Sequence, residues 1–247
     1  KNINPLLQFV DPNIFVAEES RIRSSYSRQT KKLSFEFKSD LVTYEQMKFT
    51  DILLKNQFDS LRANVQYEIG LVQLSDSLGV KNAALFSYIK DNHFSTNIGW
   101  DRYGNVEPAL FAFTTEIDSL QNVSTEFNPS FFFLQSEKWS ISPKSKFVWT
   151  PDFMQFSEFD IINKNHLVNV DGKISDDPKD WLYFQVRDFD LADLNGILEG
   201  VVTIGGVLNI DGGVSDVYKN IRFMSLSDIK DLVIDGELVG DLLVDNK

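Results

Sequence analysis

The sequence predicts an all-β protein whose main element is a long, mainly antiparallel sheet with at most short helical turns. Apolar and polar residues alternate with period two in many segments, turn-forming residues separate those segments, and no long stretch has the period of a helix. Such alternation buries one face of each strand and leaves the other in water, as is typical of antiparallel sheets. With 247 residues, of which 43% are hydrophobic, the chain can bury a sizeable core.

A hairpin between residues 168 and 186 is the clearest element. Its apolar positions alternate with polar ones on both sides of a polar turn over 176–180. These positions are Val168, Val170, Ile174, Leu182, Phe184 and Val186. We expect the two strands to pair antiparallel, with Ile174 and Leu182 flanking the turn. Residues 190–198 then predict one or two helical turns that end near Gly200.

Alternation also predicts strands elsewhere in the chain. They are expected over 33–37, 61–71, 94–100, 109–117, 221–226, 232–235 and 242–244. In the second of these, the apolar positions include Leu61, Val65, Tyr67 and Ile69. Residues 201–210 predict a hairpin that turns at Gly205-Gly206.

The remaining segments are less regular. Residues 1–12 predict a short helical or irregular lead-in. In 121–165 the three prolines are expected at edges or turns, because proline cannot donate to a β ladder. The triplet Asp-Ser-Leu recurs at 59–61, 76–78 and 118–120, near expected turns. No change in composition marks a linker, so we expect one continuous β-structure over 1–247.

The charge balance narrows the possible partners. The net charge is −12 and the isoelectric point is near 4.6. This argues against nucleic acid as a partner and against binding an anionic membrane surface through a basic face. There is no cysteine, so disulfides, zinc–thiolate sites and cysteine nucleophiles are excluded. The sequence contains neither an apolar run of eighteen residues nor a signal peptide.

Neither the histidines nor the adjacent acids form a pattern that predicts catalysis, a metal site or a cofactor site. His93 and His166 are the only histidines and lie far apart in the sequence, so we expect ordinary surface residues. Asp176 and Asp177 are adjacent in a Pro-containing turn, which favours turn formation over acid–base catalysis. The serine-hydrolase elbow, the dinucleotide fingerprint and the Walker A pattern are all missing.

An acidic cluster near residue 190 has a structural explanation. Asp188, Asp190 and Asp193 are spaced as D-x-D-x-x-D, which does not satisfy the calcium-loop pattern. We expect Asp190 or Asp193 to cap a helix instead.

Two segments near the C-terminus carry a resemblance to a known family. They are DGKISDDPKDWLYFQVRDFDLADLNGIL, residues 171–198, and IKDLVIDGELVGDLLVDNK, residues 229–247. The first resembles a G-x-I-S-x-x-P-x-D hairpin that is followed by a strand and by F-x-L-x-x-L-N. The second resembles I-x-D-L-x-I-x-G-x-x-x-G-D-L. Both elements recur in TamB proteins of the AsmA-like group, in the version of Bacteroidota-type bacteria, and the best match covers 168–247.

The resemblance implies a sheet folded over as an open groove (a β-taco), whose apolar interior runs between the two bacterial membranes. It implies phospholipid transport and outer-membrane protein assembly, with phospholipid acyl chains and a BamA-like outer-membrane barrel (TamA-type) as partners. The expected location is the periplasm. We expect the chain to be a fragment of a protein that a preceding segment anchors in the inner membrane.

From the residues alone, the apolar face is either a packed core or the lining of a groove for hydrocarbon chains. With the resemblance, we expect a non-enzymatic scaffold. Its expected groove lining is Val168, Val170, Ile174, Leu182, Phe184, Val186, Leu61, Val65, Tyr67 and Ile69.

Two other classes of protein would show the same alternation of apolar and polar residues. A carbohydrate-binding or carbohydrate-active protein would use flat rings, and the four tryptophans, Trp100, Trp139, Trp149 and Trp181, supply them; most fall in apolar phase with their strands, which favours packing. An outer-membrane barrel also alternates with period two, but its final strand usually ends on an aromatic residue, whereas this chain ends on Lys247.

Overall fold

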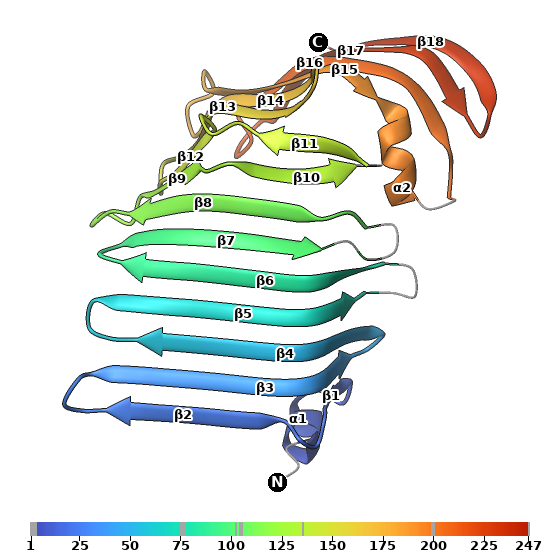
Figure 1. Ribbon diagram of the computed structural model, residues 1–247. Helices are drawn as coiled ribbons and strands as arrows, with labels where there is room; N and C mark the ends of the chain where they lie inside the picture. Colours follow the sequence, from blue (N-terminus) through green and yellow to red (C-terminus); the bar gives the residue numbers. More distant parts are fainter. Residues whose placement is uncertain are drawn as a thin grey trace. The chain divides into compact units, whose positions relative to one another are not determined.

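The computed structural model describes residues 4–74, 78–101, 103, 106–134, 136–198 and 201–246. Strands dominate this part of the chain (Figure 1): it contains eighteen strands, two short α-helices and one short 3-10 helix. All pairings between described strands for which a register is defined are antiparallel. The prediction of an all-β, mainly antiparallel fold with only short helical turns is therefore confirmed.

The chain divides into two compact units, residues 1–114 and 115–247. We call them unit 1 and unit 2 and describe each by itself. The boundary falls inside strand β8 (Ala109–Ile117), where no linker-like composition marks it.

Unit 1 is a meander in which consecutive strands from β2 to β7 pair with each other (Figure 1). Before β8, its elements are α1 (Asn4–Val10), β1 (Ile14–Val16), β2 (Arg21–Ser27), β3 (Lys32–Tyr44), β4 (Met47–Phe58), β5 (Arg62–Gln73), β6 (Gly79–Lys90) and β7 (His93–Asp101). The β6–β7 turn consists of Asp91 and Asn92, which both have positive φ. Two such residues match the twist of a tight hairpin. In the β4–β5 turn, Oδ1 of Asp59 accepts the N–H of Leu61 at 2.8 Å, so this Asp-Ser-Leu triplet does form a turn.

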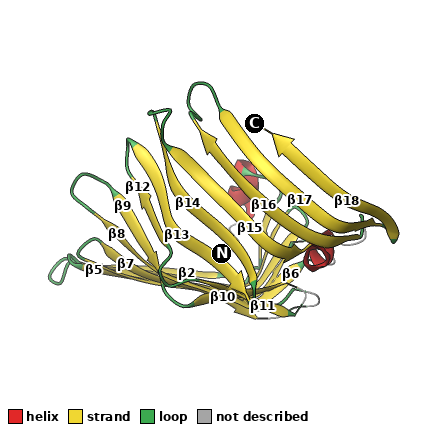
Figure 2. Cartoon of the chain, turned by 90° about the horizontal axis from the view of Figure 1, so that it is seen from above, coloured by secondary structure: helices red, strands yellow, loops and turns green. Residues whose placement is uncertain are grey.

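Unit 2 contains a run of six long strands, β13 to β18, that pair in sequence order and lie side by side in Figure 2. The elements of the unit after β8 are β9 (Val123–Phe127), β10 (Ser130–Leu134), β11 (Glu137–Ile141), β12 (Lys146–Trp149), β13 (Phe153–Asn163), β14 (His166–Ser175), β15 (Trp181–Asp190), η1 (Leu191–Leu194), α2 (Asn195–Leu198), β16 (Ile204–Ser215), β17 (Arg222–Ile234) and β18 (Glu237–Asn246). The expected prolines, Pro129, Pro143 and Pro151, all lie between strands.

The predicted central hairpin is confirmed. β14 and β15 pair antiparallel around the 176–180 turn, with Gly172 opposite Leu182 and Val168 opposite Val186. The predicted helical turns follow as η1 and α2, and their expected end at Gly200 lies outside the described residues.

Both short α-helices are tied to a strand by one asparagine. The side chain of Asn4 bonds both backbone groups of Val16, with each donor and acceptor 2.7 Å apart. The side chain of Asn195 bonds both backbone groups of Ile204 in the same way, at 2.8 Å. The asparagine amide thus takes the place of a neighbouring strand, because it offers one donor and one acceptor.

Two sequence predictions about the last strands are wrong. Gly205 and Gly206 do not form a turn, since β16 runs through both and pairs with β17 on either side of them. Gly206 has φ +122 and sits where the register shifts, so it forms a β-bulge, which glycine favours as readily as a turn. The strands expected over 221–226 and 232–235 are one strand, β17, in which the acidic Asp228 and Asp231 lie without ending it.

Candidate functional site

The six apolar residues predicted in the central hairpin lie on one face of β14 and β15. Paired residues in adjacent strands point to the same side of a sheet. Val168 is opposite Val186, Val170 is opposite Phe184, and Leu182 is opposite Gly172, two residues before Ile174. Neighbouring strands continue the face with more apolar residues. We call the whole set the apolar face of unit 2: the six residues above with Phe159, Ile161, Phe189, Leu208, Ile210, Val214 and Phe223.

This face is only half buried. Ile174 is buried, but Val168, Val170, Leu182, Phe184 and Val186 all keep an intermediate exposure, and Phe223 is 45% exposed. The inner face of a β-sandwich is instead filled by side chains of the opposite sheet. The partial exposure therefore indicates a face that protein atoms cover incompletely.

Phe184 lies flat against the next strand. An added Cβ at Gly212, its cross-strand partner, would come within 2.3 Å of the Phe184 ring, so the ring occupies the space that a side chain would take. The ring also stacks with that of Phe223, at 6.0 Å between centroids. Gly212 thus lets the aromatic rings form a smooth apolar surface over three strands.

One end of the face is closed by an aromatic cluster. Trp139 on β11 is 1% exposed, and its ring lies 5.4 Å from that of Phe189 and 6.2 Å from that of His166. The buried Leu191 follows in η1. This cluster, and not the middle of the face, is the packed core of the unit.

Unit 1 has an apolar face of its own. Tyr67 is opposite Leu54 and Leu85, and Ile69 is opposite Ile52. We call this set, with Phe37, Val65, Ala63 and Ile98, the apolar face of unit 1. Val65, Tyr67 and Ile69 have intermediate exposure. Leu61 precedes β5, lies in the turn and is 64% exposed, so the structure places it outside the strand.

A row of polar side chains crosses the apolar face of unit 1. Asn56 is opposite Val65, which is opposite Ser87, and Ser87 bonds Thr96 across the next strand at 2.9 Å. Oδ1 of Asn56 is buried and has no hydrogen-bond partner among the described residues. Alternation alone did not reveal this row, because β4, β6 and β7 each contribute a single polar residue to it and β5 contributes the apolar Val65.

The exposed surface is large for the mass. It measures 15638 Å² for 28.3 kDa, whereas a compact protein of this mass exposes about 11,000 Å², and two separate compact units of these sizes about 13,500 Å². The excess agrees with apolar faces that are incompletely covered.

The opposite face of unit 2 combines acidic and other polar groups with exposed apolar side chains, among them Met224, Leu226 and Leu243. Gln185 and Asp211 form a cross-strand pair there, and Nη2 of Arg187 reaches Oδ1 of Asp211 at 2.6 Å. The hydrogen bond from Arg187 is the largest of the effects that hold the pKa of Asp211 below its ordinary value. The carboxylate of Asp211 is thus engaged in structural contacts.

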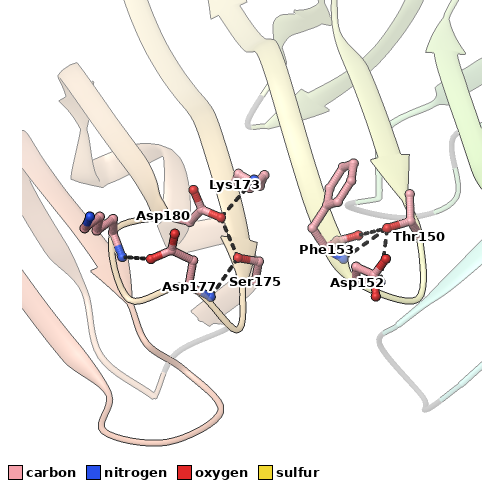
Figure 3. A network of polar contacts seen from close by, with 8 residues as sticks. Thr150, Asp152, Phe153, Lys173, Ser175, Asp177 and Asp180 are labelled. Carbon is pink, nitrogen blue, oxygen red and sulfur yellow. Dashed lines mark hydrogen bonds and ion pairs between the residues drawn. The ribbon is translucent and has the colours of Figure 1, made fainter.

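Two separate sets of polar contacts, one in the β12–β13 turn and one in the β14–β15 turn, lie beside a hollow of about 520 Å³ (Figure 3). Asp180 accepts a hydrogen bond from Ser175 and an ion pair from Lys173 at 2.9 Å, and these contacts lower the pKa of its carboxyl group. Asp177 accepts the N–H of Lys179 at 2.9 Å. Asp177, one of the two acids of the predicted turn, therefore stabilises that turn as expected, whereas its neighbour Asp176 is exposed.

The histidines and the acidic cluster have structural contacts. Nδ1 of His93 lies 2.9 Å from the carbonyl of Asp91, and His166 bonds the carbonyl of Asp188. Asp190 is the N-cap of η1 and accepts the N–H of Ala192 at 2.9 Å, which confirms its predicted role. Burial is the main cause of the raised pKa of Asp193. Among the described residues, no three His, Asp or Glu side chains come together as metal ligands.

The tryptophans differ in their surroundings. Trp139 is core, and Nε1 of Trp100 donates to the carbonyl of Glu107 at 3.0 Å. Trp149 is 44% exposed. Trp181 stacks with Tyr183 on the polar face, at 6.1 Å between ring centroids. Most tryptophans were expected on the apolar side of their strands. Trp181 is not, because it pairs with Ser215 on the face opposite Leu182.

No protein-family model, curated protein or solved structure matches the chain. In the part of the chain that the structure describes, no helix is long and apolar enough to span a membrane.

Proposed function

We propose that the chain is a non-enzymatic scaffold that holds phospholipid acyl chains against its apolar faces. The observation that carries this proposal is the half-buried state of Val168, Val170, Leu182, Phe184 and Val186 on a face built from several strands. A face of this kind offers area to an apolar ligand and few polar groups to orient it. Hydrocarbon chains are the ligands that such a surface favours, since each buried CH₂ contributes about 0.8 kcal/mol and needs no hydrogen bond.

The resemblance to TamB-like proteins supports the same proposal from the sequence. It adds that the apolar faces line one groove of a folded-over sheet, that the chain works in the periplasm as part of a longer, membrane-anchored protein, and that a BamA-like barrel is its partner. Phospholipid transport between the membranes and outer-membrane protein assembly are the corresponding processes. These points rest on the family resemblance and belong to the proposal.

Native mass spectrometry of the chain purified from bacterial cells tests the proposal. We expect co-purifying phospholipid in the wild-type protein and in Tyr183→Asp, and its loss in Phe184→Asp. The two residues are neighbours, but Tyr183 points to the polar face and is 47% exposed. The new carboxylate of Phe184→Asp would have to be desolvated beneath an acyl chain.

Thermal unfolding of the same variants separates lipid binding from folding. If Phe184 belonged to a closed core, the substitution would unfold the protein. A folded Phe184→Asp without lipid supports the scaffold, whereas wild-type protein without lipid, or with bound oligosaccharide, would contradict it and favour the carbohydrate-binding alternative.

A further inference from the structure

The polar row at Asn56 lies between two rows of aliphatic and aromatic residues. Residues that are opposite one another in adjacent strands form rows across the face of a sheet. On one side of the polar row, β3 to β7 contribute Phe37, Leu54, Tyr67, Leu85 and Ile98. On the other side they contribute Leu33, Phe58, Ala63, Ile89 and Phe94. Each of these rows is two residues along the strands, or about 7 Å, from the polar row.

The polar row keeps hydrogen-bonding capacity that the described residues do not use. Oδ1 of Asn56 is buried and has no partner among them. The hydroxyl groups of Ser87 and Thr96 bond each other at 2.9 Å. A hydroxyl group has one donor and two acceptor sites, so this contact uses only one of the two donors in the pair. The row therefore offers both an acceptor and a donor to a ligand on the face.

A plain hydrocarbon chain over this row would leave its polar groups unpaired, which is costly. A hydroxyl group can donate to Oδ1 of Asn56 and accept from the Ser87–Thr96 pair, whereas an ester group only accepts. Asn56 keeps an intermediate exposure, and the last torsion of an asparagine side chain is broad. The amide oxygen can therefore turn toward a ligand that lies on the face.

We propose that the apolar face of unit 1 binds acyl chains that carry a hydroxyl group within the chain. The chain lies along the strands, with its hydroxyl group at the polar row and an apolar segment on each flanking row. Because those rows lie about 7 Å to either side, the hydroxyl group needs several methylene groups on both sides. This inference rests on the proposed acyl-chain scaffold and adds the class of chain that unit 1 selects.

Native mass spectrometry of the whole chain with an equimolar mixture of stearate and 12-hydroxystearate tests the selection, because the two probes differ by one mid-chain hydroxyl group. We expect the wild-type protein to prefer 12-hydroxystearate by up to about tenfold. Asn56→Leu removes the amide at similar volume and should bring the ratio close to one. Asn64→Leu is the matched control: this exposed asparagine of β5 is opposite Gln57 on the other face of unit 1, and its variant should keep the wild-type ratio.

Thermal unfolding of the same proteins accounts for folding. Asn56→Leu should raise the melting temperature, because it removes a buried acceptor that has no partner. Ser87→Ala/Thr96→Val is a second variant that should also reduce the preference, so the test does not depend on the folding of one protein.

The outcomes separate this inference from the proposed function. Wild-type protein that binds neither fatty acid would overturn both. Wild-type protein that binds the two equally would overturn the selection for a hydroxyl group and leave the acyl-chain scaffold standing. A preference that persists in Asn56→Leu and in Ser87→Ala/Thr96→Val would overturn the role of the polar row. Fatty acid on unit 2 contributes equally to all variants, so it does not alter their order.

Discussion

The backbone N–H of Glu158 donates to Oδ1 of Asp171 on the next strand, at 3.0 Å. Glu158 has a positive φ and lies at a β-bulge in β13. The same arrangement recurs in two further strand pairs of unit 2, β15–β16 and β17–β18, each time with a positive-φ residue at a bulge in the first strand and an acceptor side chain in the second. The pairs are Asp188 with Asn209 and Asp231 with Asp241, both at 2.9 Å. Bulges increase the twist of a strand pair, so the side chains hold the bends of the sheet in place.

Replacing the acceptor should loosen the bulge. We expect Asp171→Ala to lower the free energy of unfolding by about 0.5–1.5 kcal/mol, because the N–H of Glu158 loses its partner. Asp171→Asn keeps an acceptor oxygen and should remain close to wild type. Urea unfolding measures both variants, and equal losses in the two would show that the carboxylate charge, and not the hydrogen bond, matters at this position.

The two adjacent glycines of β16 should respond differently to alanine. At Gly206 a Cβ would lie 2.8 Å from the carbonyl oxygen of Lys230, and φ is +122. We expect Gly206→Ala to cost about 1–3 kcal/mol, since a side chain strains this backbone conformation. Gly205→Ala meets only Cβ of Val233 at 3.7 Å and should cost little. Thermal unfolding distinguishes them; similar melting temperatures would mean that the bulge does not form.

The turn carboxylates should make the fold sensitive to acid. Hydrogen bonds from Ser175 and Lys173 lower the pKa of Asp180, and a backbone hydrogen bond from Leu61 lowers that of Asp59. A group whose pKa is lower in the folded state stabilises the fold above its unfolded pKa, and that stability is lost as the pH falls through the folded pKa. We therefore expect the melting temperature to fall below about pH 4.

A pair of variants tests whether Asp180 causes part of this loss of stability in acid. Asp180→Asn should flatten the acid dependence of the melting temperature, whereas Asp176→Asn, an exposed residue of the same turn, should leave it unchanged. An unaltered pH profile in Asp180→Asn would place the acid sensitivity elsewhere.

Alternation in the sequence predicts correctly which residues share a face as long as no bulge interrupts the strand. Beyond a bulge the prediction is wrong, because the extra residue changes which side chains point to that face. From Val168 to Ile174 the phase is continuous, and the predicted face is present. In β15, Val186 and Phe189 lie three residues apart but pair with Ile210 and Leu208, which lie two apart. The bulge therefore puts Phe189 on the apolar face, out of the predicted phase.

The degree to which a face is covered is not encoded in its alternation, because a sandwich and a single layer bury alternate residues in the same pattern. Sequence reasoning also missed Gly212 and the polar row at Asn56. In both cases the decisive neighbour lies on another strand: Phe184 for Gly212, and Phe35 and Val65 for Asn56.

Photo-crosslinking should locate lipid on the apolar face of each unit. A photoreactive phenylalanine analogue at Phe184 or at Tyr67 replaces one aromatic ring with another on an apolar face. The same analogue at Tyr183 or at Phe86 lies on the opposite face, where these residues are 47% and 42% exposed. Acyl chains that cover an apolar face lie within contact distance of rings on that face and are separated from the other side by the sheet.

On illumination in cells, we therefore expect lipid adducts at Phe184 and Tyr67 and few at Tyr183 and Phe86, measured by mass spectrometry of the purified protein. Adducts at Phe184 without adducts at Tyr67 would restrict lipid binding to unit 2. Equal labelling on both faces would mean that alternation does not select the lipid-binding surface. Protein adducts in place of lipid at both apolar positions would show that another polypeptide covers these faces, and the scaffold would then bind protein instead of lipid.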